Sequence, residues 1–133
     1  MLGEQVGHDK GRVTGRRVLD GDGDVAMEVS FEAMGKLLGV EMQTMGTYQS
    51  KMRPDGTFYG TGNGVLMSKT GEMMTWKGHG VGRLTDTGGM MFRGAIYPYS
   101  QTPTWKKLNG AALVYEHEVD AQGNTEDKLW EWR

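Results

Sequence analysis

Two segments of this chain carry glycine at every second position, and this spacing narrows the folds that the chain can adopt. Residues 60–64 read Gly-Thr-Gly-Asn-Gly, and residues 78–82 read Gly-His-Gly-Val-Gly. A period of two is typical of a β-strand, whose successive side chains point to opposite faces. Glycine weakens a strand unless it permits sharp coiling or the close approach of a neighbour. We therefore expect two strands that carry rows of glycine on one face of a strongly coiled sheet.

Turn-forming sequences recur at short intervals along the rest of the chain. Examples are Asp20-Gly21-Asp22-Gly23, Arg53-Pro54-Asp55-Gly56 and Asp86-Thr87-Gly88-Gly89, which supply residues that accept positive φ or favour a β-turn. The stretches between the turns predict about eight strands, near residues 11–19, 24–34, 38–52, 57–68, 72–84, 89–99, 109–119 and 125–132. Short strands with tight turns indicate an all-β fold, a single antiparallel up-and-down β-barrel. We expect one domain over 1–133, with residues 1–10 as a loose N-terminal segment.

Helical structure is expected in at most one or two short turns. Residues 30–39 are compatible with two turns of helix or with a strand that bends at Gly35. Residues 102–110 are the better helical candidate, because Thr102 suits a cap, Pro103 the first helical position and Gly110 the end. We place one helical turn there, inside the longest connection.

The hairpin around residues 69–71 indicates which side chains face the barrel interior. A three-residue loop with a left-handed Gly71 places Ser68 opposite Glu72, and both glycine rows then share a face with Trp76. The same alternation predicts further inward positions at Val25, Met27, Val29 and Phe31; Val40, Met42, Thr44 and Tyr48; Met90, Phe92, Gly94 and Ile96; Ala111, Leu113, Tyr115, His117 and Val119; and Trp130 and Trp132. Residues 11–19 leave the inward face open, because both alternating sets contain an arginine.

Composition and spacing exclude several classes of function. The chain has no cysteine, so disulfides and thiol chemistry are excluded, and a cytoplasmic location fits. Its charge is nearly balanced, with 15 basic and 17 acidic residues, which argues against a nucleic-acid partner. Residues 1–10 hold no apolar run, so no membrane span is expected. Three histidines without paired spacing predict no metal site, and no cofactor motif is present. Every acidic residue is expected on an outer face or in a turn.

The expected inner face is apolar and aromatic, with a few polar groups. This composition is typical of small-molecule sites. The candidate ligand-binding residues are His117, Tyr115, Tyr48, Trp76, Phe58, Phe92 and Trp130. The volume beneath the glycines is either filled by these aromatic side chains or open as a pocket near Trp76, and the sequence leaves both alternatives open.

The pattern of strands and glycines resembles the small eight-stranded barrels of the calycin and allene-oxide-cyclase-like type. The features that carry the resemblance are the glycine segment at 60–64, Trp76-Lys77-Gly78-His79-Gly80-Val81-Gly82, Phe92-Arg93-Gly94 and Trp130-Glu131-Trp132. The resemblance is architectural and covers most of residues 11–132. No characterised member matches by motif, and no catalytic residue carries over.

Three functions are compatible with this barrel. The leading hypothesis is a non-enzymatic barrel that binds a small apolar or amphipathic ligand in its interior. The first alternative is an isomerase or cyclase that uses the same cavity, with His117 or a tyrosine moving a proton. The second alternative is a filled barrel that serves as an interaction or assembly module. In that case a homo-oligomer would form through outward methionines such as Met73 and Met91.

Overall fold

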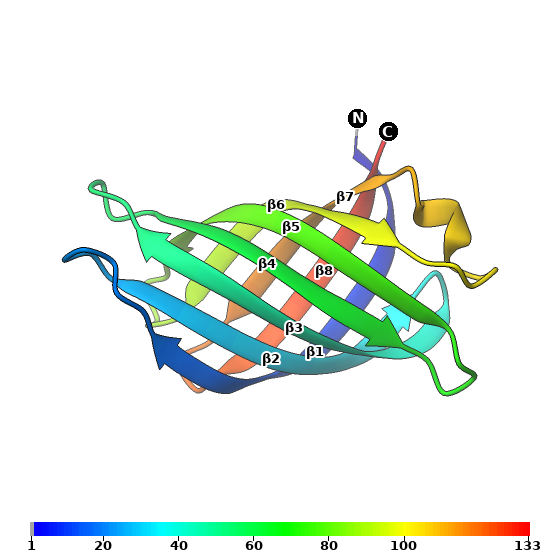
Figure 1. Cartoon of the computed structure of the whole chain (residues 1–133), viewed down its shortest axis with the longest axis horizontal. Coiled ribbons are helices and arrows are strands. Elements are labelled where there is room, and N and C mark those ends of the chain that lie inside the picture. Colours follow the sequence, from blue (N-terminus) through cyan, green and yellow to red (C-terminus); the bar gives the residue numbers. More distant parts are fainter. Residues whose placement is uncertain (1) are drawn as a thin grey trace.

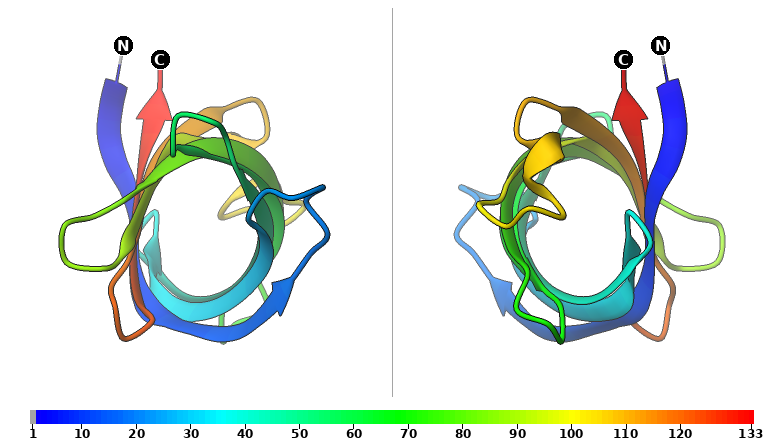
Figure 2. Two further views of the ribbon diagram at one scale, coloured as in Figure 1. Left: turned by 90° about the vertical axis from the view of Figure 1, so that its left-hand side faces the viewer. Right: turned by 90° about the vertical axis from the view of Figure 1, so that its right-hand side faces the viewer.

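The computed structural model describes residues 2–133, which form a closed barrel of eight antiparallel strands in chain order (Figure 1). The strands are β1 (Leu2–Val18), β2 (Ala26–Leu37), β3 (Val40–Met52), β4 (Phe58–Met67), β5 (Met73–Leu84), β6 (Met90–Tyr99), β7 (Ala112–Val119) and β8 (Asn124–Trp132). Seen end-on, the strands form a continuous ring (Figure 2). The all-β up-and-down barrel predicted from the sequence is therefore confirmed.

The barrel closes where β1 pairs with β8. Leu2 lies opposite Trp132, and Asp9 lies opposite Asp127. The expected loose segment at residues 1–10 is therefore wrong for residues 2–10, which lie in β1, while Met1 lies outside the described residues. These residues are ordered because their backbone groups pair with β8 and leave no free edge in the sheet.

The connection between β4 and β5 follows the expected turn chemistry. The Ser68 N–H donates to the Glu72 carbonyl at 3.0 Å, and Gly71 has φ +94°, as a three-residue loop requires. Residues 30–37 continue as strand. Gly35 lets β2 pass close to β1 at this point, because a Cβ on residue 35 would lie 2.5 Å from the Cα of Asp9 on β1. The connection from β6 to β7 contains one 3₁₀ turn, η1 (Lys106–Leu108).

Most of the expected inward positions are buried or half-buried, with corrections at the strand ends. Val25 is exposed at 50%, because it lies directly before the first residue of β2. The main error concerns β8, whose buried positions are Thr125, Asp127 and Leu129. Trp130 and Trp132 alternate with these buried positions along the strand and therefore lie on the outer face.

The glycine rows make room for aromatic rings inside the barrel. A Cβ on Gly64 would lie 2.5 Å from the indole of Trp76, and one on Gly82 would lie 2.5 Å from the ring of Phe92. A Cβ on Gly80 would lie 2.1 Å from the hydroxyl oxygen of Tyr115. Aromatic side chains therefore occupy much of the space that the glycines leave free.

One end of the barrel is closed by an apolar core. Trp105, next to η1, is completely buried, and its indole N–H donates to the Leu37 carbonyl at 3.1 Å. This end is the right-hand one in Figure 1, where η1 and both termini lie. The buried side chains packed together there are Leu37, Met42, Leu66, Met74, Ile96, Trp105, Leu108, Leu113 and Leu129.

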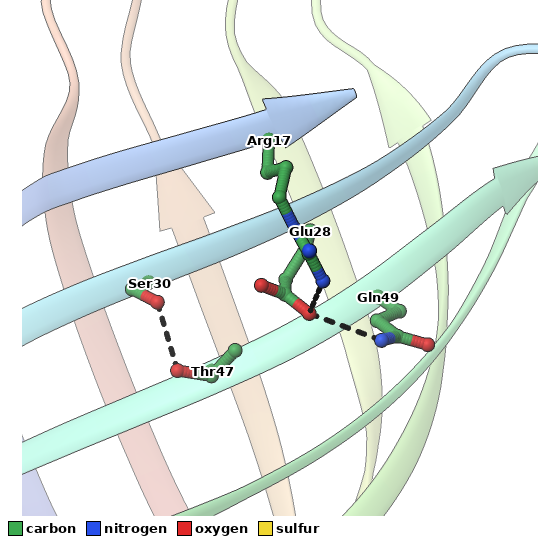
Figure 3. A network of polar contacts seen from close by, with 5 residues as sticks. All are labelled: Arg17, Glu28, Ser30, Thr47 and Gln49. Atoms are coloured by element: carbon green, nitrogen blue, oxygen red, sulfur yellow. Dashed lines mark hydrogen bonds and ion pairs between the residues drawn. The ribbon is translucent and has the colours of Figure 1, made fainter. Parts of the chain in front are cut away.

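The outer face of β1, β2 and β3 shows how polar side chains support the register (Figure 3). Glu28 accepts hydrogen bonds from Arg17 at 3.2 Å and from Gln49 at 3.1 Å, and these residues are its direct partners on the two neighbouring strands. The hydrogen bond from Gln49, followed by that from Arg17, lowers the pKa of Glu28. Such cross-strand pairs on the outer face favour this register over a slipped one.

Candidate functional site

A row of ionisable side chains crosses the interior from β7 to β1. His117 on β7 lies directly opposite Asp127 on β8, and Asp127 lies directly opposite Asp9 on β1. All three residues are at most 8% exposed. Because direct partners in a sheet present their side chains to the same face, the register brings three groups that are distant in sequence into one line.

The imidazole of His117 is held by Asp127 and by aromatic rings. Its Nδ1 lies 2.5 Å from Oδ1 of Asp127. Ring centroids lie at 5.0 Å for Phe31, 5.5 Å for Tyr48 and 6.3 Å for Phe92. The Nε2 atom of His117 is buried and has no hydrogen-bond partner in the described residues. One imidazole nitrogen is therefore fixed, and the other is available for a further interaction.

The two carboxyl groups of the row differ in charge: one is neutral and the other is negative. Burial, followed by repulsion from Asp127, raises the pKa of Asp9 to about 10, so this carboxyl holds a proton at neutral pH. Burial also acts to raise the pKa of Asp127, but the electrostatic attraction and the hydrogen bond of His117 outweigh burial and lower that pKa. Oδ1 of Asp9 and Oδ2 of Asp127 are both buried, and neither has a hydrogen-bond partner among residues 2–133. The row is thus a carboxylic acid, a carboxylate and an imidazole.

Two tyrosines extend the polar part of the interior. The hydroxyl of Tyr115 donates to the His79 carbonyl at 3.2 Å, and burial raises its pKa to about 12. Burial also raises the pKa of Tyr48, with a smaller contribution from the charge of Asp127. Both hydroxyl groups therefore keep their protons across the physiological range and can act only as neutral donors or acceptors.

A cavity of about 80 Å³ lies between the polar row and the apolar core. One ordered water needs ~10–15 Å³ of such volume, so the cavity has room for several waters or one small molecule. Its polar lining comprises Asp9, His117, Asp127, Tyr48, Tyr115, Thr44 and His79, and its apolar lining includes Phe31, Leu66, Met74, Trp76, Phe92 and Ile96. Among residues 2–133, no lysine or arginine lines it.

The structure brings five of the seven candidate residues to this cavity, namely His117, Tyr115, Tyr48, Trp76 and Phe92. Phe58 is buried at the start of β4, and it lies outside the cavity lining. Trp130 lies on the outer face of β8, which corrects the expectation that it faces inward. The interior is partly filled and partly open: aromatic rings cover the glycines, and a small cavity still remains.

Neither aspartate of the row was predicted from the sequence. The expectation that every acidic residue lies outside is wrong, because Asp9 and Asp127 are 5% and 8% exposed. A local signal for Asp127 existed in the turn at residues 120–123, which places Val119 opposite Thr125 and therefore His117 opposite Asp127. Asp9 had no such signal, because its position depends on how β1 and β8 close the barrel.

Within residues 2–133, no group of three or more histidine, cysteine or acidic side chains is placed to hold a metal ion. The described part of the chain also contains no helix with the length and apolar character to cross a membrane.

Comparisons with known proteins show the fold and no function. No protein-family model matches this chain, and no curated protein matches it. A conserved protein of unknown function from Rhodopseudomonas palustris is 13% identical with a TM-score of 0.80, over 98% of this chain and 97% of that one. A protein of unknown function from Clostridium acetobutylicum is 13% identical with a TM-score of 0.83, over 98% of both chains. The chain therefore shares its barrel with uncharacterised bacterial proteins.

Proposed function

We propose that this barrel binds a small, mostly apolar molecule in its interior, with the polar group of that molecule facing His117. The observation that carries the proposal is the cavity of about 80 Å³, which joins an aromatic and aliphatic wall to a buried imidazole nitrogen without a partner. Apolar walls with a few convergent polar groups are the usual composition of small-molecule sites. A buried polar atom without a partner costs free energy that a ligand would recover.

The size and charge of the cavity restrict the ligand further. A volume of about 80 Å³ fits a molecule no larger than a single ring, unless side chains move. The lack of lysine and arginine in the lining disfavours a carboxylate or phosphate ligand, because an anion would be buried beside Asp127 without a cationic partner. We therefore propose a neutral ligand. We also propose a relationship to the calycin and allene-oxide-cyclase-like barrels, which the strand pattern supports. The lack of cysteine supports a cytoplasmic location.

Binding is tested first by native mass spectrometry of the purified protein and then with three one-ring probes, toluene, benzyl alcohol and cyclohexanone. Saturation-transfer NMR reports whether protons of each probe receive magnetisation from the protein. The variant Leu66→Phe reduces the cavity, and Val65→Ile on the outer face of the same strand is its control. We expect signals for the wild type and Val65→Ile and their loss in Leu66→Phe. A wild-type protein that carries no co-purified molecule and gives no signal with any probe would overturn the proposal.

A further inference from the structure

The interior row has the arrangement of a general base and its orienting group. The Nδ1 of His117 is 2.5 Å from the Asp127 carboxylate, which is an acceptor and therefore fixes the hydrogen on Nδ1. The neutral imidazole then presents a lone pair at Nε2, the atom without a partner in the described residues. An aspartate that holds the tautomer in this way also stabilises the imidazolium that forms when Nε2 takes up a proton.

A proton-holding group lies beside this base. The ring of Tyr48 lies 5.5 Å from the imidazole of His117, and both residues line the same cavity. The Tyr48 hydroxyl has no hydrogen-bond partner among those observed in residues 2–133 and stays protonated at neutral pH, because burial raises its pKa. It can therefore donate a hydrogen bond to an oxygen atom of a bound molecule on which negative charge develops.

A purely structural role explains this row less well. Buried polar networks that serve stability have all their members satisfied. Here Nε2 of His117, Oδ1 of Asp9 and Oδ2 of Asp127 remain without hydrogen-bond partners among residues 2–133, and no lysine or arginine of those residues lines the cavity. Buried, mutually perturbed ionisable groups at a cavity are typical of sites that move protons.

We propose, as an extension of the proposed ligand-binding function, that the barrel catalyses proton transfer at carbon in a small neutral carbonyl compound, with His117 as the base. Nε2 of His117 removes a proton from the carbon next to the carbonyl group. The electron pair of the broken C–H bond forms a C=C bond, and the C=O π pair moves to oxygen, which accepts a hydrogen bond from Tyr48. The imidazolium exchanges its Nε2 proton with water and then gives a proton to the same carbon, or it returns the original proton to a conjugated carbon. Atoms and electrons balance without a co-reactant, so the reaction is an exchange or an isomerisation.

The experiment uses cyclohexanone in D₂O with the folded wild-type protein. Loss of the α-proton signal in ¹H NMR measures exchange, and saturation transfer on the same sample measures binding. We expect exchange well above a buffer that contains free imidazole at the concentration of the protein. The rate should fall by ~10²-fold in His117→Gln, since this is the usual contribution of a positioned general base. Glu118→Gln, on the exposed face of β7, is the control and should match the wild type.

Asp127 acts through His117 and is a positioning residue. Asp127→Asn should lower the exchange rate while cyclohexanone still binds. A measurement without any variant covers the case in which a substitution prevents folding: ¹⁵N NMR of the wild type should show Nδ1 protonated and Nε2 unprotonated at pH 8. Binding with exchange at the background rate, exchange that persists in His117→Gln, or a hydrogen on Nε2 would overturn the proton-transfer inference and leave ligand binding intact. Absence of binding by all probes would overturn both.

Discussion

The most unusual residue of this protein is Asp9, a carboxylic acid kept neutral inside a β-barrel. Its pKa of about 10 in the folded state results from burial and from the neighbouring Asp127, with a smaller effect of Glu126. In an unfolded chain the pKa of aspartate is ~3.9. The folded state therefore keeps a proton that the unfolded state releases, so the contribution of Asp9 to stability is complete below pH ~4 and is lost as the pH rises towards 10.

The variant Asp9→Asn tests this linkage. An asparagine is nearly isosteric, cannot ionise, and can donate its amide N–H to Asp127. We expect the free energy of unfolding at pH 9 to exceed that of the wild type by ~1 kcal/mol or more, the equivalent of one pKa unit, and the difference to shrink at pH 5. Urea denaturation of both proteins at pH 5, 7 and 9 measures it. Equal pH dependence in the two proteins would contradict the buried neutral acid.

Gly64 tests the contact between a glycine and an aromatic ring. An alanine Cβ would lie 2.5 Å from the Trp76 indole and 2.6 Å from the Met45 carbonyl oxygen, and the second group is backbone that cannot move freely. Overpacking of this kind costs ~1–3 kcal/mol. Gly15→Ala is the control, because no atom of the described residues, its two chain neighbours aside, would lie within 4 Å of a Cβ there. Thermal unfolding should show a loss for Gly64→Ala alone, and equal melting temperatures would disprove the contact.

At the scale of the elements, the sequence predicted the strands well because their signals are local. Alternating glycines and turn residues identify β4 and β5, and the loop at 69–71 sets their register. The site is less predictable because it depends on pairing between elements. His117 was expected inside from its own strand, but the inward face of β8 was assigned from its two tryptophans. Glu116 lies opposite Lys128 on the outer face, and this pairing of opposite charges indicates the correct face of β8.

The connection between β6 and β7 should stabilise the barrel through Trp105. This side chain is completely buried in the apolar core and hydrogen-bonded to Leu37. Trp105→Ala should lower the free energy of unfolding by ~3–5 kcal/mol, because it leaves a large void in the core. Trp132→Ala is the matched control, since Trp132 is 60% exposed, and it should change stability far less. Similar losses in both variants, measured by urea denaturation, would show that η1 does not close this end.

At the scale of the whole molecule, each strand is paired on both sides, so the sheet offers no free edge for a second chain. Self-association, which the sequence left open as one alternative, would then have to use outward side chains such as Met73, which is 57% exposed. The same closure places the two ends of the described chain side by side, with Leu2 opposite Trp132 (Figure 1).

This adjacency predicts that the barrel tolerates circular permutation. A short Gly-Ser linker would join residue 133 to residue 2, and new ends would be placed in the exposed turn at 86–88, which connects β5 and β6. All eight strand pairs survive, and the entropy of loop closure changes slowly with loop length, so we expect cooperative thermal unfolding with a melting temperature close to that of the parent.

A second permutant opened between Val114 and Tyr115 interrupts β7 beside His117, and it should lose cooperative unfolding. Circular dichroism of the two permutants distinguishes a closed barrel from an open sheet. In an open sheet the β1–β8 pairing would contribute little, and joining the ends would strain the chain. Failure of the first permutant to fold would therefore contradict the closure that places Asp9 next to Asp127, and with it the interior site.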